Sequence, residues 1–261
     1  MERMGSVGRQ EMNTPQHSGI ASAMTAVEIQ GRRCSVVADA CARFLILQPV
    51  DDHDQALLGS EVESIRSLTP VPFTLVAFYI RDWLNELTPW PSAPVFGKQG
   101  FGADAPATLS FVCNALLPAL QQRNLYDPEK HRLVLGGYSL AGLFALWAGS
   151  QSDRFSGVVA ASPSVWYPGW TDYASRHPLQ ASVAYLSLGN KEEQVRNPVM
   201  SRVGDCLRLQ QKLLDEQGTA SVLEWNEGGH FLHPDKRTAR GFAWALNQLD
   251  RSGGHTKECK P

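Results

Sequence analysis

The chain has 261 residues, of which 43% are hydrophobic and 19% are charged, and its formal net charge is −2. This length and composition fit one α/β domain with a sizeable buried core. A nearly neutral chain lacks the basic surface that nucleic acids or an anionic membrane attract, so we expect neither as a partner.

Strands and helices alternate along the chain. Residues 1–22 are rich in Gly, Ser, Gln and Asn and are predicted to be a flexible segment before a single domain at 23–250. Short apolar segments predict strands, at 27–29, 34–37, 43–49, 73–80, 131–137, 156–161, 182–188 and 221–225. Apolar residues at helical spacing predict helices, the first after capping residues 51–54 and the others at 107–122, 139–148, 197–217 and 236–249. Residues 251–261 form a polar tail. The alternation predicts an α/β fold with a mostly parallel central sheet and helices on both faces.

The cysteines and the apolar runs bear on location. Five scattered cysteines without a C-x-x-C pair predict neither a zinc site nor a disulfide framework. The N-terminal residues lack the apolar run of a signal peptide, and the apolar stretches elsewhere are too short for a transmembrane helix. We therefore expect a cytoplasmic protein.

A serine stands between a predicted strand and an apolar helix, in the segment Gly137-Tyr138-Ser139-Leu140-Ala141. This segment is close to the nucleophile elbow G-x-S-x-G, with alanine in the last position. The sharp turn requires small residues two before and two after the serine, and alanine meets this condition nearly as well as glycine. The segment predicts an α/β-hydrolase fold with Ser139 as the nucleophile; the alternative is a simple turn capped by Ser139.

The base that activates such a serine is expected near the end of the domain, because the chain order in this fold is Ser, acid, His. His230 and His233 are the candidates that remain after the seven histidines are compared with this order. His230 follows the last strand and a turn at Glu227-Gly228-Gly229, so we favour it. His233 precedes Pro234 at the helix start, where a capping role is expected.

The acid is expected after the strand at 182–188, where the segment 189–193 supplies adjacent carboxylates. Glu192 is the favoured residue and Glu193 the second, with Asp172 and Asp205 more distant alternatives. The acid would orient the histidine and stabilise its cation.

These segments together resemble the esterase D-like family of α/β-hydrolases, especially its siderophore-esterase-like branch. The resemblance extends from about Phe44 to Leu249 and rests on the segments 137–143 and 161–167 (Ala-Ser-Pro-Ser-Val-Trp-Tyr), on Gly189 with Glu192, and on Gly229-His230-Phe231. The family usually has Gly-Gly where this chain has Ala141-Gly142. It includes carboxylesterases, feruloyl and siderophore esterases, thioester hydrolases and some acyltransferases. Some siderophore-esterase-like members use a Ser–His pair alone, which is the alternative to a role for Glu192.

Backbone amides are expected to hold the oxyanion of the reaction. One is the N–H of Leu140, directly after the nucleophile, and the second is that of Trp83 or its neighbour Asp82 in the loop after the strand at 73–80. The long connection at 81–106 is rich in aromatic residues. Together with the segment after residue 165 it predicts an aromatic pocket for an aryl or hydrophobic acyl group, with the candidates Trp90, Trp166 and Tyr167. The alternative is that these aromatic residues only pack the loop onto the sheet.

The segment Asp51-Asp52-His53-Asp54 brings carboxylates and an imidazole together, so a metal site is one hypothesis for it. Four consecutive residues cannot all converge on one ion, so helix capping is the favoured interpretation, and neither a metal nor a cofactor is expected. The predicted function is hydrolysis of a small-molecule carboxylic ester through an acyl-enzyme intermediate. The alternatives are acyl transfer by the same residues and a non-catalytic ligand-binding protein on a hydrolase scaffold. The sequence does not indicate an oligomeric state.

Overall fold

A computed structural model describes residues 24–252. The predicted flexible segment at 1–22 and most of the predicted polar tail lie outside the described residues. Within 24–252, no helix is long and apolar enough to span a membrane.

Eight strands form one sheet in the order β1-β2-β4-β3-β5-β6-β7-β8. β2 pairs antiparallel with both of its neighbours, β1 and β4, and all the other neighbouring strands pair parallel. The sheet is therefore mostly parallel, as the alternation of strands and helices predicts. The strands are β1 Thr25–Ile29, β2 Arg32–Val37, β3 Phe44–Val50, β4 Phe73–Tyr79, β5 Arg132–Tyr138, β6 Phe155–Ala161, β7 Val183–Gly189 and β8 Ala220–Asn226. The fold class is therefore confirmed, and the strand bounds differ from the predicted ones by a few residues at most.

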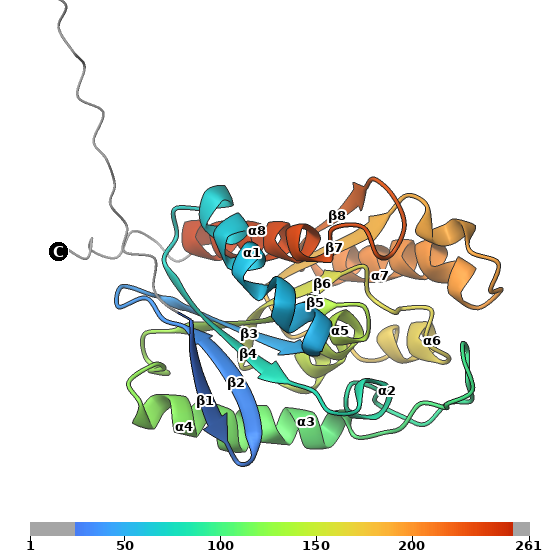
Figure 1. Ribbon diagram of the computed structural model, residues 1–261. Helices are drawn as coiled ribbons and strands as arrows, with labels where there is room; N and C mark the ends of the chain where they lie inside the picture. The colour runs from blue at the N-terminus through green and yellow to red at the C-terminus, as the bar shows by residue number, and fades with distance from the viewer. Residues whose placement is uncertain (1–23, 253–261) are drawn as a thin grey trace, which may run out of the picture.

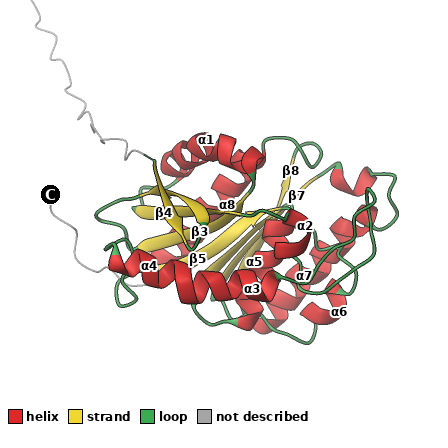
Figure 2. Cartoon of the chain, turned by 60° about the horizontal axis from the view of Figure 1, so that its bottom comes forward, coloured by secondary structure: helices red, strands yellow, loops and turns green. Residues whose placement is uncertain are grey.

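Helices cover both faces of the sheet (Figure 1). They are α1 Asp52–Leu68, α2 Trp83–Glu86, α3 Ala105–Phe111, α4 Leu117–Gln122, α5 Leu140–Gln151, α6 Trp170–Ala174, α7 Val203–Gln217 and α8 Pro234–Ser252. α1 and α8 pack on one face, while α3, α4, α5 and α7 pack on the other. In Figure 2 this second group of helices lies in front of the strands. Successive side chains of a strand point to opposite faces of the sheet. In β3 and β5, Ile46 and Val134 pack toward α1 and α8, whereas Leu47 and Leu135 pack toward the helices of the other face. Because both faces are covered, these strands are continuous apolar runs.

The helix predicted at 107–122 is interrupted by one wide turn at Val112–Leu116, between α3 and α4. In this turn the N–H of Leu117 donates to the carbonyl of Val112, five residues back. Pro118 explains the change, because proline has no N–H with which to continue the regular ladder. Two shorter differences lie elsewhere. α2 forms inside the connection after β4, and the helix predicted to begin at residue 197 becomes regular only at Val203.

The parallel strands end at the same edge of the sheet, where ligands bind in folds of this kind. The loops that follow β3, β4, β5, β6, β7 and β8 therefore meet there. They carry the residues from which the candidate site is built.

Candidate active site

Ser139 stands on a tight turn between β5 and α5, with φ 58° and ψ −120°. This backbone conformation is strained for a residue with a side chain. Two hydrogen bonds hold it: the Ser139 N–H donates to the carbonyl of Ala161 at 3.1 Å, and the Ser164 N–H donates to the carbonyl of Ser139 at 3.0 Å. A Cβ added to Gly137 would lie 2.5 Å from the Cβ of Ala141. Ala141 is thus accommodated because the residue that faces it, Gly137, has no side chain.

A line of hydrogen bonds connects Ser139, His230 and Glu192. The Oγ of Ser139 lies 3.1 Å from Nε2 of His230, and Nδ1 of His230 lies 2.7 Å from Oε2 of Glu192. The three residues come from the ends of β5, β8 and β7, so their assembly follows from the parallel order of these strands. Such an arrangement can move a proton from a serine hydroxyl to a histidine while the carboxylate stabilises the resulting cation.

The alternative residues lie elsewhere in the structure. His233 has φ 52° just before α8, and its carbonyl accepts the Arg237 N–H at 3.1 Å. Glu193 forms an ion pair with Arg208 at 2.8 Å. The more distant candidates also make local contacts: Asp205 pairs with Arg208 at 2.9 Å, and the carbonyl of Asp172 accepts from Ser175 and Arg176.

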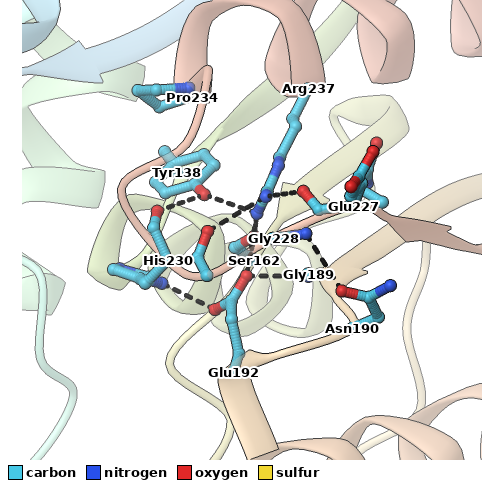
Figure 3. A network of polar contacts seen from close by, with 12 residues as sticks. Tyr138, Ser162, Gly189, Asn190, Glu192, Glu227, Gly228, His230, Pro234 and Arg237 are labelled. Carbon is cyan, nitrogen blue, oxygen red and sulfur yellow. Dashed lines mark hydrogen bonds and ion pairs between the residues drawn. The ribbon is translucent and has the colours of Figure 1, made fainter.

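The second oxygen of Glu192 is fully engaged as well (Figure 3). Oε1 accepts hydrogen bonds from the Gly189 N–H at 2.7 Å, from the Ser162 hydroxyl at 2.8 Å and from Nη1 of Arg237 at 2.9 Å. Burial of Glu192 works to raise its pKa. The hydrogen bond and the charge of His230, together with the hydrogen bonds from Gly189 and Ser162, outweigh burial and hold the pKa of Glu192 below its ordinary value. The carboxylate is therefore ionised at neutral pH.

Arg237 links the acid to the loop that carries His230. Its side chain projects from α8 into the interior, and the residue is only 2% exposed. Besides Glu192, Nη1 contacts the Tyr138 hydroxyl and the Ser162 hydroxyl at 3.1 Å each. Nη2 donates to the carbonyls of Glu227 at 2.9 Å and Gly229 at 3.0 Å. One buried guanidinium thus connects α8, the acid and the turn before His230.

Tyr138 supports the same loop from the strand side. Its hydroxyl donates to the carbonyl of His230 at 2.6 Å. Burial, followed by the nearby charge of Glu192, raises the pKa of Tyr138 to about 12, so the hydroxyl keeps its proton at neutral pH. Arg237, Tyr138 and Ser162 carried no sequence signal for these contacts, although Tyr138 and Ser162 lie inside the segments that indicated an esterase.

Leu140 and Trp83 are the residues whose backbone amides the sequence predicts as oxyanion donors. Leu140 and Trp83 are the first residues of α5 and α2, so neither N–H has an acceptor within its own helix. Both residues line one cavity together with Ser139. The N–H of Asp82, the alternative to Trp83, already donates to Oε1 of Glu86 at 2.9 Å.

The cavity beside Ser139 has a volume of about 390 Å³. Trp166 lines it, as predicted for a pocket residue, but Trp90 and Tyr167 are not among its lining residues. The indole of Trp90 donates to the carbonyl of Pro168 at 2.8 Å, and the hydroxyl of Tyr167 donates to the carbonyl of Trp90. The placement of Trp90 and Tyr167 in the pocket is therefore corrected: they fasten the connection after β4 to the loop after β6. When a tyrosine or tryptophan is buried, its O–H or N–H group usually donates a hydrogen bond, as these two residues do to backbone carbonyls.

The segment 51–54 begins α1. Oδ1 of Asp51 accepts the N–H of Asp54 at 2.9 Å, which is the capping contact that the sequence predicts. Among residues 24–252, no group of three or more His, Cys, Asp and Glu residues is arranged to hold a metal ion.

Residues 87–239, more than half of the chain, match the family described as "Putative esterase". The chain belongs to this family. The sequence of this esterase matched no curated protein.

Solved structures resemble this esterase in fold. An IroE-like serine hydrolase from Shewanella oneidensis has a TM-score of 0.69 at 14% identity, over 90% of this chain and 82% of that one. Siderophore hydrolase EstA from Aspergillus nidulans has a TM-score of 0.63 at 20% identity, over 94% and 100%. The enterobactin esterase FES from Shigella flexneri has a TM-score of 0.61 at 18% identity, over 90% and 62%. At these identities the likeness establishes the shared fold.

Proposed function

We propose that this esterase hydrolyses a small-molecule carboxylic ester through an acyl-enzyme intermediate, with Ser139 as nucleophile, His230 as base and Glu192 as the orienting acid. The observation that carries the proposal is the continuous line of hydrogen bonds from Ser139 Oγ through His230 to Glu192. A serine hydroxyl is a weak nucleophile unless a neighbouring base accepts its proton, and His230 lies within reach to do so.

In the first half of the reaction, Ser139 Oγ attacks the ester carbonyl carbon while His230 Nε2 takes the hydroxyl proton. The carbonyl oxygen becomes an oxyanion, which accepts hydrogen bonds from the N–H groups of Leu140 and Trp83. The bond to the alcohol oxygen then breaks, and His230 returns the proton to the departing alcohol. In the second half, water takes the place of the alcohol and the acid product leaves Ser139.

Glu192 and its partners prepare His230 for both halves. The ionised carboxylate accepts from Nδ1, which leaves Nε2 free to accept the serine proton. Arg237 holds the other carboxylate oxygen, so Glu192 cannot rotate away from His230 without breaking a buried ion pair. Tyr138 and Arg237 fix the backbone on either side of the imidazole. These contacts keep the donor and acceptor atoms in reacting geometry.

A cytoplasmic location belongs to the same proposal. The thiols of Cys34, Cys113 and Cys206 are not in disulfides, which is compatible with a reducing compartment.

A fluorophosphonate probe tests the nucleophile. We expect it to label the wild-type enzyme and to miss Ser139→Ala, whose kcat/KM on p-nitrophenyl butyrate should fall by at least about 10³-fold. Ser164→Ala is the matched comparison, because its hydroxyl lies only 3.3 Å from that of Ser139. This variant should still be labelled. Equal labelling of wild type and Ser139→Ala would refute the proposal.

A further inference from the structure

The cavity beside Ser139 is apolar over most of its wall. Its nonpolar lining consists mainly of Trp83, Phe96, Trp166, Val195, Val203 and Phe231. The polar lining residues are the serines Ser139, Ser162 and Ser164 together with His230 and Glu192. Among the described residues, those that line the cavity include no lysine or arginine. Its carboxylate, Glu192, is negative, so an anionic ligand would find a like charge there and no lysine or arginine to pair with.

Phe231 is the most exposed large apolar residue of the described chain, at 91%. It directly follows His230, and the two rings meet edge to face with centroids 5.2 Å apart. Phe96 and Val195, which line the same cavity, are also exposed, at 41% and 39%. Exposed apolar side chains gathered around a cavity are typical of a surface that a ligand covers.

A second, smaller hollow of about 140 Å³ opens on the same serine. Trp83, Ser139, His230 and Phe231 line both spaces. The smaller hollow is also lined by Asp51 and Asp54. Among the described residues, neither of these carboxylates forms an ion pair. An apolar group is therefore better accommodated in the larger cavity, which Phe231 lines together with Ser139.

We propose that this esterase selects esters of uncharged, apolar acyl groups, and that Phe231 packs over the bound acyl chain and sets this selectivity. The inference rests on the proposed function, since it requires the acyl group to be attached to Ser139. A volume of about 390 Å³ lies at the lower end of the range for small-molecule sites and suits an acyl chain of modest length. Packing against Phe231 would bury apolar surface on both partners, which stabilises the bound chain.

The wild-type test compares p-nitrophenyl esters that share one leaving group. We expect kcat/KM to rise roughly fourfold per methylene from acetate to hexanoate, the fold-change that corresponds to moving one CH₂ group out of water. The monoester of adipate has the length of hexanoate but ends in a carboxylate. Its kcat/KM should be lower than that of hexanoate by at least about tenfold, because the cavity offers this charge no partner.

The role of Phe231 is tested by the ratio of kcat/KM for hexanoate to that for acetate, which does not depend on the fraction of active enzyme. Phe231→Ala should lower this ratio by roughly tenfold, the usual order for lost apolar contacts in a pocket. Phe231→Leu should recover part of it. Leu209→Ala is the control, because Leu209 is an exposed leucine of α7, 38% exposed, that does not line the cavity. Its ratio should equal that of the wild type.

Three results would overturn the inference: a flat chain-length profile in the wild type, equal kcat/KM for the adipate monoester and hexanoate, or an unchanged ratio in Phe231→Ala. Each can occur while turnover still depends on Ser139, which leaves the proposed function standing. Failure of the proposed function has another signature, because Ser139→Ala would then turn over every ester as the wild type does.

Discussion

Replacement of Arg237 by methionine should destabilise the protein strongly, because it leaves a buried carboxylate without its ion-pair partner. The side chains of Arg237 and Glu192 are 3% and 5% exposed, and their atoms lie 2.9 Å apart. Removing one partner of such a buried pair costs about 3–5 kcal/mol of unfolding free energy. For a domain of this size that corresponds to a fall in Tm of roughly 6–20 °C. The bonds to the carbonyls of Glu227 and Gly229 are lost at the same time.

The measurement is urea unfolding at pH 7, followed by tryptophan fluorescence, together with kcat/KM on a p-nitrophenyl ester. Arg208→Met is the matched control, because Arg208 pairs with the neighbouring Glu193 but its side chain is 49% exposed. Exposed pairs contribute about 0–1 kcal/mol, so this variant should remain close to the wild type in stability and activity. If Arg237→Met lost no more stability than Arg208→Met, the structural role given to Arg237 would be wrong.

Three further predictions follow from buried groups. Glu192→Gln should lower kcat by about 10²- to 10⁴-fold, whereas Glu193→Gln should stay within about twofold of the wild type; similar losses would contradict the choice of acid. Gly137→Ala should lower the free energy of unfolding by about 1–3 kcal/mol through overpacking, because the new Cβ would lie 2.5 Å from that of Ala141. Adding the change Ala141→Gly should restore part of this loss, which thermal unfolding measures. Glu61 is 3% exposed with Oε1 unpartnered among the described residues, and burial raises its pKa well above the ordinary value. A raised carboxyl pKa gives stability that is complete below the unfolded value of about 4.3 and is lost as the pH rises toward the folded value. Glu61→Gln should therefore raise the unfolding free energy by about 1–3 kcal/mol at pH 8 and much less at pH 4; an equal gain at both would count against a raised pKa.

The fold could be predicted from the sequence because its central strands are continuous apolar runs separated by helices. Burial on both faces produces that pattern, and the parallel order then follows from the alternation. Local departures from this pattern were harder to predict from the sequence. α2 has only four residues, too few for a periodic signal, and the wide turn at Val112–Leu116 depends on Pro118 inside an otherwise helical segment.

The candidate site was predictable where its residues follow strands. Ser139, Glu192 and His230 come after strands that end at one edge of the sheet, and the structure brings them together. Their catalytic roles stay predictions. Arg237 could not be found in this way, because an arginine in the first turn of a helix usually lies in solvent. Its burial arises only when α8 meets the loops that carry the acid and the histidine. Aromatic composition likewise predicted a pocket that included Trp90, but it could not indicate that the Trp90 indole would turn to the carbonyl of Pro168.

Trapping the acyl-enzyme tests the central claim most directly. The enzyme is mixed with p-nitrophenyl hexanoate, quenched in acid during turnover, and examined by intact-mass and peptide mass spectrometry. We predict one added hexanoyl group, located on the peptide that contains Ser139 and absent from Ser139→Ala. An adduct on another residue, or steady turnover with no adduct that depends on Ser139, would contradict the proposal that this serine carries the acyl group.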